Sequence, residues 1–277
     1  LDYWASRWSC LFLGSKFPIE YRAMLRGLQT HFNEPLNNDS LVSELADKTV
    51  QLARIDAQVS DKATTQAMTK EVESEGIGTL VIVRDSAQIK WLNDMAELRN
   101  EPDIEGPEPE VYRDLLWEAA EVADEYGVTL CGPAVSGFHK RGLGYLKAIG
   151  PLPPNVICSI HDYPEPGGYW SDAKAAEKLR ALRDIIGPDR HIIYSEMGAH
   201  TAPERFGRRP FSQTVQRTNE EALIYLQEAF IFLTVNGIDA AVVYQLNDGP
   251  ENVPLHRYGM RDINGKWKIQ MRAFRRN

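Results

Sequence analysis

The chain has 277 residues, of which 31 are Lys or Arg and 39 are Asp or Glu, giving a net charge of −8. Hydrophobic residues make up 43% and charged residues 25%, which is ordinary for a globular domain and excludes disordered, collagen-like and disulfide-scaffold chains. The acidic balance argues against a nucleic-acid partner. No apolar stretch reaches the roughly 18 residues of a membrane span, so we expect a soluble protein with no membrane partner. Composition leaves the oligomeric state open.

The cysteines and the chain start carry little functional information. Cys10, Cys131 and Cys158 lack metal-ligand spacing, and we expect the last two to be buried free thiols because they lie in apolar runs. No signal peptide is visible after Leu1. If a leader has been removed, a secreted or periplasmic location is favoured. We treat residues 1–22 as an N-terminal extension of unknown role.

Short apolar runs rich in Val, Ile, Leu or Thr alternate with longer stretches of helical periodicity. Several runs are apolar throughout, as strands buried on both faces are. The predicted strands are 24–32, 50–57, 79–84, 95–100, 127–131, 156–161, 191–196 and 239–245.

The predicted helices are 39–48, 61–75, 108–126, 171–186 and 217–236. In 108–126 the stripe Val111, Leu115, Ala119 and Val122 is expected to face the core, Gly127 ends the helix, and Trp117 is expected to be a core residue. About ten residues separate the third and fourth strands, so the helix between them must be short, around Ile89–Leu92.

Eight strands alternating with helices predict an α/β protein, a single (β/α)8 barrel over residues 23–277 with a short third helix. The alternative, an open doubly wound sheet, calls for a glycine-rich phosphate turn after an early strand, and the sequence has none.

Ionisable residues follow many of the predicted strands. In a barrel these strand ends meet at one mouth, where barrel enzymes carry their active sites. Glu101 follows strand four and Glu196 ends strand seven, on opposite sides of that mouth. Two carboxyl groups about 5–5.5 Å apart are what a retaining glycosidase requires, one as nucleophile and one as acid/base.

These segments resemble clan A of the glycoside hydrolases, with families 39 and 5 as the nearest. The matching segments are Leu98-Arg99-Asn100-Glu101-Pro102, Tyr194-Ser195-Glu196-Met197-Gly198, Arg54 in Ala-Arg-Ile-Asp, His161-x-Tyr163, and the tail Tyr258–Lys268. The resemblance implies that Glu101 is the acid/base, Glu196 the nucleophile and Asn100 a ligand of the sugar 2-hydroxyl. It also implies that Arg54 and Tyr163 contact the nucleophile and that His161 orients the site.

Several positions depart from the clan or remain open. Strand eight ends in Tyr244-Gln245 where the clan usually has Trp, so Tyr244 is a candidate sugar platform and Gln245 a candidate hydroxyl ligand. His31 and Trp170 are further candidate sugar contacts, each with a structural alternative. His139, His200 and His256 either line the cleft or are simply solvated loop residues. A second Asn-Glu-Pro, at Asn33-Glu34-Pro35, follows the wrong strand, so Glu34 is interpreted as a loop residue.

The sequence thus predicts a retaining O-glycosidase of a β-linked oligo- or polysaccharide, with no cofactor because two carboxyl groups suffice. The histidines lack metal-ligand spacing, so no metal is expected, which weakens the alternative of a metal-dependent hydrolase. A carbohydrate-binding pseudoenzyme on the same barrel remains the main alternative, and a structural or interaction protein is a further one.

Overall fold

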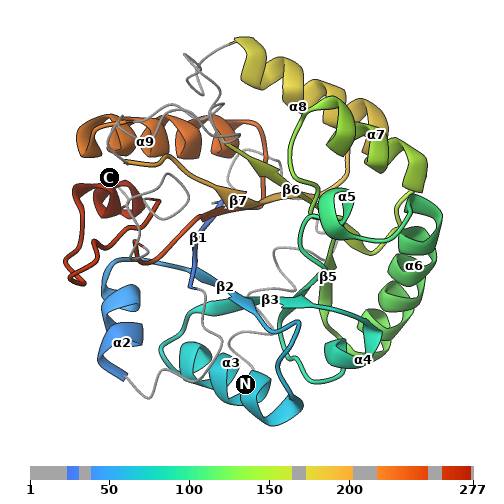
Figure 1. The fold of residues 1–277 in the computed structure, drawn as a ribbon, viewed down its shortest axis with the longest axis horizontal. Coiled ribbons are helices and arrows are strands. Elements are labelled where there is room, and N and C mark those ends of the chain that lie inside the picture. Colours follow the sequence, from blue (N-terminus) through green and yellow to red (C-terminus); the bar gives the residue numbers. More distant parts are fainter. Residues whose placement is uncertain (1–23, 31–38, 164–172, 202–216, 249–257, 276–277) are drawn as a thin grey trace.

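The computed structural model describes residues 24–30, 39–163, 173–201, 217–248 and 258–275. In this part of the chain, eight parallel strands pair in sequence order, and β1 pairs with β8 to close a barrel. Helices surround the strands when the barrel is viewed along its axis (Figure 1). The predicted (β/α)8 fold is therefore confirmed.

Each of the eight strands overlaps the residue range of one predicted strand. They are β1 (Leu25–Gln29), β2 (Leu52–Asp56), β3 (Gly78–Val83), β4 (Met95–Leu98), β5 (Thr129–Cys131), β6 (Val156–Asp162), β7 (Ile192–Met197) and β8 (Ala240–Val243). The helices are α2 (Asp39–Asp47), α3 (Lys62–Ser74), α4 (Ser86–Ile89), α5 (Pro102–Glu105), α6 (Pro109–Tyr126), α7 (Lys140–Ile149), α8 (Ala173–Ile186), α9 (Asn219–Val235) and the 3-10 helix η4 (Ile269–Phe274).

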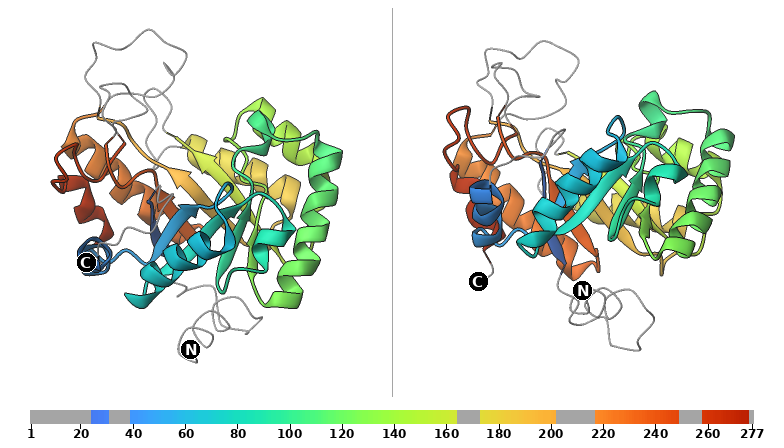
Figure 2. Two further views of the ribbon diagram at one scale, coloured as in Figure 1. Left: turned by 60° about the horizontal axis from the view of Figure 1, so that its bottom comes forward. Right: turned by 90° about the horizontal axis from the view of Figure 1, so that it is seen from below.

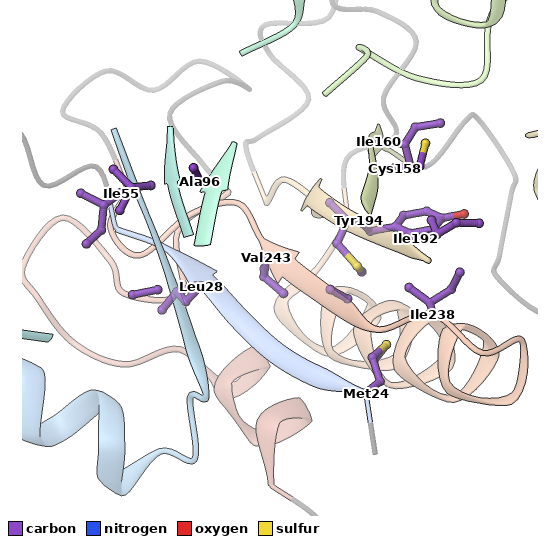
Figure 3. Packing of buried hydrophobic residues seen from close by; sticks show 14 of the residues in the cluster. Met24, Leu28, Ile55, Ala96, Cys158, Ile160, Ile192, Tyr194, Ile238 and Val243 are labelled. Atoms are coloured by element: carbon purple, nitrogen blue, oxygen red, sulfur yellow. The ribbon is translucent and has the colours of Figure 1, made fainter. Parts of the chain in front are cut away.

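Alternate side chains of the strands form two separate hydrophobic clusters. The larger lies between the strands and the helices and includes Leu28, Ile55, Cys158 and Tyr194, which Figure 3 shows with their neighbours. The smaller fills one end of the barrel interior; its members are Leu25, Leu52, Leu80, Met95, Cys131, Ile157, Ile193, Ala240 and Val242. Cys131 and Cys158 are buried free thiols, as expected.

The C-terminal segment packs on the outside of the barrel. The side views of Figure 2 show η4 (red) beside α9 (orange) and close to α2 (blue). Phe274 lies edge-on to Phe230 of α9, and Trp267 Nε1 donates to Glu44 Oε2 of α2 over 2.7 Å. None of the helices in the described part of the chain has the length and apolarity needed to cross a bilayer.

The region between β5 and β6 contains a helix that the sequence did not predict. Helix α7 includes Gly142 and Gly144, and glycine lowers helix propensity. A Cβ at Gly142 would lie 2.3 Å from the carbonyl oxygen of Gly137, so close packing requires glycine there. The short α5 was also not predicted, and α4 begins three residues earlier than expected.

The buried stripe of α6 differs from the predicted one. The helix buries Tyr112, Leu116, Ala119, Ala120 and Ala123, whereas Val111 is 52% exposed and Trp117 is 43% exposed. The predictions that Val111 faces the core and that Trp117 is a core residue were therefore wrong. Three of the five buried residues are alanines, so the buried side of the helix is not the side that carries Val111 and Trp117.

Asp94 immediately precedes β4. It therefore lies at the N-terminal ends of the strands, whereas the predicted site lies at their C-terminal ends. Its Oδ2 accepts a hydrogen bond from the backbone N of Thr79 over 2.7 Å, and Thr79 Oγ1 donates to Glu73 Oε1 over 3.0 Å. Burial raises the pKa of Asp94 to about 7; the bond from Thr79 opposes this rise and the charge of Glu73 adds to it.

Replacing Asp94 with Asn should flatten the pH dependence of stability. The folded pKa of Asp94 lies above its unfolded value, so its contribution is complete below about pH 4 and is lost as the pH rises through about 7. The difference in free energy of unfolding between the wild type and Asp94→Asn, from urea titrations, should change by up to about 4 kcal/mol across that window. A constant difference would contradict the assignment.

Candidate active site

The barrel interior changes from apolar to polar along its axis. Because side chains alternate along a strand, Leu52 and Arg54 point to the same side of β2, as do Met95 and Glu97 of β4. The first member of each pair belongs to the inner apolar cluster. Two residues further along each strand, polar side chains therefore face one another inside the barrel.

Arg54 is the centre of this polar layer and is completely buried. Its Nε and Nη2 donate to Glu97 Oε1, and its Nη1 donates to Glu196 Oε1 over 2.7 Å. Nη1 also donates to Gln29, and Nη2 donates to Asn100 Oδ1 over 2.7 Å. A guanidinium has five N–H groups, and these five contacts use all of them. Burial lowers the pKa of Arg54, but the charges of Glu97 and Glu196 outweigh it and hold the pKa above its ordinary value.

A register shift places Glu196 in the same interior. Ile160 pairs with Tyr194, but His161 pairs with Glu196, so β7 has one extra residue at this point. Tyr194 belongs to the outer cluster, whereas Ser195 Oγ lies 2.6 Å from the interior Ser159 Oγ. The irregularity turns Glu196 back toward the barrel axis, which is a common use of bulges beside functional sites.

The carboxylate of Glu196 is bound on both oxygens. Oε1 accepts from Arg54, and Oε2 accepts from the hydroxyl of Tyr163 over 2.7 Å and lies 3.4 Å from His161 Nδ1. Burial raises the pKa of Glu196, but the charges of His161 and Arg54 and the hydrogen bonds from Tyr163 and Arg54 outweigh it, so the pKa lies below its ordinary value. Glu196 is therefore an ionised carboxylate at neutral pH.

Glu101 lies across from Glu196, on the turn that leaves β4. Its backbone φ is 42°, and Arg99 two residues earlier has φ 59°, a left-handed conformation that non-glycine residues adopt at a cost of about 1–3 kcal/mol. The turn is held by the hydroxyl of Tyr112, which donates to the carbonyl of Leu98 over 2.7 Å, and by a β-bridge between Asn100 and Ala134.

The two carboxyl groups meet at His161. Its Nδ1 lies 2.9 Å from Glu101 Oε1, and one ligand atom from each of Glu101, His161 and Glu196 lies within 4.8 Å of the others. Burial lowers the pKa of His161, but Glu196 and the hydrogen bond with Glu101 outweigh it and raise the pKa. The Glu101 side chain is 27% exposed and that of Glu196 11%, so both reach the surface of the mouth.

The residue that follows β8 contributes an aromatic group beside Glu196. Tyr244 lies edge-on to Tyr163 and Tyr258, with ring centroids 6.4 and 5.7 Å apart. A Cβ at Gly198 would lie 2.6 Å from the carbonyl oxygen of Tyr244, so glycine lets β7 and β8 converge here. Burial and the charge of Glu196 raise the pKa of Tyr244 to about 12, so its hydroxyl stays protonated. Gln245 is 7% exposed.

The structure brings together most, though not all, of the sequence-predicted residues. Arg54, Asn100, Glu101, His161, Tyr163, Glu196, Tyr244 and Gln245 are at the strand ends as expected. His31 and Trp170, together with Glu34 and His256, lie outside the described residues.

Two loop histidines left open by the sequence have structural contacts. His139 caps the N-terminus of α7: its Nδ1 accepts from the backbone N of Gly142 over 3.1 Å, and its Nε2 lies 3.0 Å from Ser136 Oγ. Ser136 Oγ lies 2.5 Å from Asp103 Oδ2. Because Nδ1 accepts, Nε2 carries the proton, so His139 cannot act as a base toward Ser136. His200 is 4% exposed and lies edge-on to Tyr258.

Sequence reasoning missed Glu97. Its carboxylate is fully buried, and Ser159 Oγ donates to its Oε2 over 2.7 Å. A charged residue between apolar neighbours in a predicted buried strand was the available signal, because such a charge requires a partner of opposite sign inside the barrel.

No family model and no curated protein matches this sequence, but solved structures do. A family 39 glycoside hydrolase from Bacteroides cellulosilyticus is 15% identical with a TM-score of 0.61, covering 94% of this chain and 64% of that one. A GH5-4 broad specificity endoglucanase from Clostridium acetobutylicum is 11% identical with a TM-score of 0.65, covering 91% and 96%. A GH128 endo-β-1,3-glucanase from Sorangium cellulosum is 15% identical with a TM-score of 0.61, covering 90% and 97%.

At these identities the likeness is one of fold. It confirms that the chain shares the barrel of the glycoside hydrolases it was expected to resemble. The chain spans just under two thirds of the family 39 protein's length.

Replacing Arg54 with Met should lower the free energy of unfolding by about 3–5 kcal/mol, because Glu97 and Glu196 would lose a buried counter-charge. Urea unfolding would measure the loss. Arg84→Met is the matched control, since Arg84 pairs with Asp85 at the surface and should contribute less than about 1 kcal/mol. Equal effects for the two variants would contradict the role assigned to Arg54.

Proposed function

We propose that this protein is a retaining glycoside hydrolase that cleaves β-linked oligo- or polysaccharides, with Glu196 as nucleophile and Glu101 as general acid/base. The observation that carries the proposal is the close approach of these two carboxyl groups, whose oxygens come within 4.8 Å across His161. Retaining enzymes hold the two groups about 5–5.5 Å apart, whereas inverting enzymes leave about 6.5–9.5 Å for a water molecule.

The two carboxyl groups differ in ionisation and in exposure, and each difference suits the role proposed for that group. Glu196 has a lowered pKa and is held on both oxygens, which suits a carboxylate that must be ionised before it attacks. Glu101 is the more exposed of the two, so a leaving group and then water can reach it.

The proposed reaction has two steps. Glu196 attacks the anomeric carbon while the bond to the leaving oxygen breaks and Glu101 gives that oxygen its proton. We assign the transferred proton to Oε2 of Glu101, because Oε1 is engaged with His161. In the second step Glu101 takes a proton from water, the resulting hydroxide attacks the anomeric carbon, and the ester bond to Glu196 breaks.

Other residues have supporting roles in this proposal. Asn100 is held by Arg54 beside Glu101, where its amide suits a sugar hydroxyl. Tyr163 donates to the nucleophile, and Tyr244 offers an aromatic surface beside it. Among the similar structures, one is described as a broad specificity endoglucanase and another as an endo-β-1,3-glucanase, so β-glucans are the first substrates to assay.

The metal-dependent hydrolase considered from the sequence is less well supported. Glu101, His161 and Glu196 have suitable ligand atoms, but the Arg54 guanidinium lies 2.7 Å from Glu196 Oε1. A cation at this triad would have to bind against that fixed positive charge.

A 2-deoxy-2-fluoro glycoside panel with good leaving groups tests the nucleophile. We expect intact-protein mass spectrometry to show one added glycosyl group that maps to Glu196 and disappears in Glu196→Gln. Turnover in that variant should fall by at least about a thousandfold. A label on another carboxylate would contradict the assignment, and glycan binding by folded protein with neither labelling nor turnover would indicate the carbohydrate-binding pseudoenzyme.

The acid/base role predicts a dependence on the leaving group. Glu101→Gln should slow hydrolysis of β-linked oligosaccharides by about 10²–10⁴-fold, but it should affect formation of the glycosyl-enzyme much less with aryl fluoro-glycosides that leave without protonation. Glu34→Gln is the matched control, because Glu34 lies in the other Asn-Glu-Pro of the chain, Asn33-Glu34-Pro35, and should be dispensable. An equal loss with both kinds of leaving group would overturn the role of Glu101.

A further inference from the structure

Arg54 serves two carboxylates rather than one. Glu97 takes both the Nε and an Nη2 hydrogen bond, whereas Glu196 takes one bond from Nη1. The Glu97 side chain has no exposure, so solvent does not screen its charge. Glu97 therefore neutralises much of the positive charge of Arg54, which weakens the electrostatic effect of that charge on Glu196.

Glu97 is itself held in one position. Its Oε2 accepts from Ser159 Oγ over 2.7 Å, and Ser159 lies 2.6 Å from Ser195 Oγ, next to Glu196 in β7. Glu97, Arg54 and Glu196 thus form a chain of fixed hydrogen bonds from β4 through β2 to β7. A displacement of Glu97 would move the guanidinium and, with it, Oε1 of Glu196.

Other titratable groups lie near these two carboxylates, and among them the charge of His161 also lowers the pKa of Glu196. Burial raises the pKa values of Cys131 from β5 and Tyr112 from α6 well above ordinary, so both groups near Glu97 stay neutral. Glu196 is faced by Arg54 from β2, Glu101 after β4, His161 from β6, Tyr163 after β6 and Tyr244 after β8.

We propose that Glu97 is a positioning residue for the reaction: by sharing the Arg54 guanidinium with Glu196, it fixes the orientation of that carboxylate and preserves its nucleophilicity. This inference rests on the proposed function. Without the charge of Glu97, Arg54 would neutralise Glu196 more fully and make it a weaker nucleophile.

Glu97→Gln is the direct test, because glutamine keeps the shape of the side chain and removes its charge. Its amide oxygen can still accept from Arg54, and its amide nitrogen can donate to Ser159 Oγ, which reverses that hydrogen bond. We expect the acidic limb of the pH profile for inactivation by a 2-fluoro glycoside to move down by roughly one pH unit, since Glu196 loses a neighbouring negative charge. We expect the inactivation rate constant on the plateau to fall about threefold to tenfold, because a less basic carboxylate is a poorer nucleophile.

Two comparison variants separate charge from structure. Asp94→Asn neutralises a carboxyl three residues earlier, at the other end of the same strand, and should leave the limb unmoved. Glu97→Asp keeps the charge but shortens its reach, so the plateau rate should fall while the limb stays near that of the wild type. If Glu97→Gln does not fold, an unchanged plateau rate in Glu97→Asp would overturn the proposal.

Carbon-13 titration of the Glu196 carboxyl, assigned by its absence in Glu196→Gln, needs no turnover. It should show the same downward shift in folded Glu97→Gln. An unmoved or upward-shifted Glu196 titration would overturn the role of Glu97, even with normal labelling of the wild type. If the 2-fluoro glycosides do not label the wild type but the Glu196 titration is shifted in Glu97→Gln, the result would count against the proposed function and not against the role of Glu97.

Discussion

A single buried guanidinium connects the parts of this site. Arg54 uses all five of its N–H groups to hold side chains from β1, β4 and β7 and from the turn after β4. No other side chain can make this set of contacts, because lysine has three donors on one atom and no planar fork. Together with the charge of His161, this fixed positive charge allows Glu196 to be ionised while it is buried.

Strand geometry determines which residues reach this guanidinium. Two-residue alternation places Arg54, Glu97 and Ser159 above the apolar inner cluster, and the extra residue in β7 brings Glu196 to the same side. The site is thus built on strands whose outer faces pack against the helices. This support limits movement of the carboxylates, which the proposed double displacement at a single carbon would require.

The sequence was sufficient for the barrel and for most of the candidate site, because both depend on local patterns. Buried strands appear as apolar runs, and the Asn-Glu-Pro and His-x-Tyr segments place their side chains at strand ends. The missed features depend on contacts between distant segments. Helix α7 packs closely on Gly137 at Gly142, and the exposure of Val111 and Trp117 follows from which side of α6 meets the barrel. Glu97 binds Arg54, which lies 43 residues earlier in the chain.

The configuration of the first sugar released tests the central claim most directly. Proton NMR of a β-linked oligosaccharide or aryl β-glycoside during early hydrolysis would report the anomer before mutarotation. Carboxyl oxygens within 4.8 Å of one another predict that the β-anomer forms first, by double displacement through Glu196. Initial formation of the α-anomer would contradict the account, because single displacement requires a water molecule between the two groups.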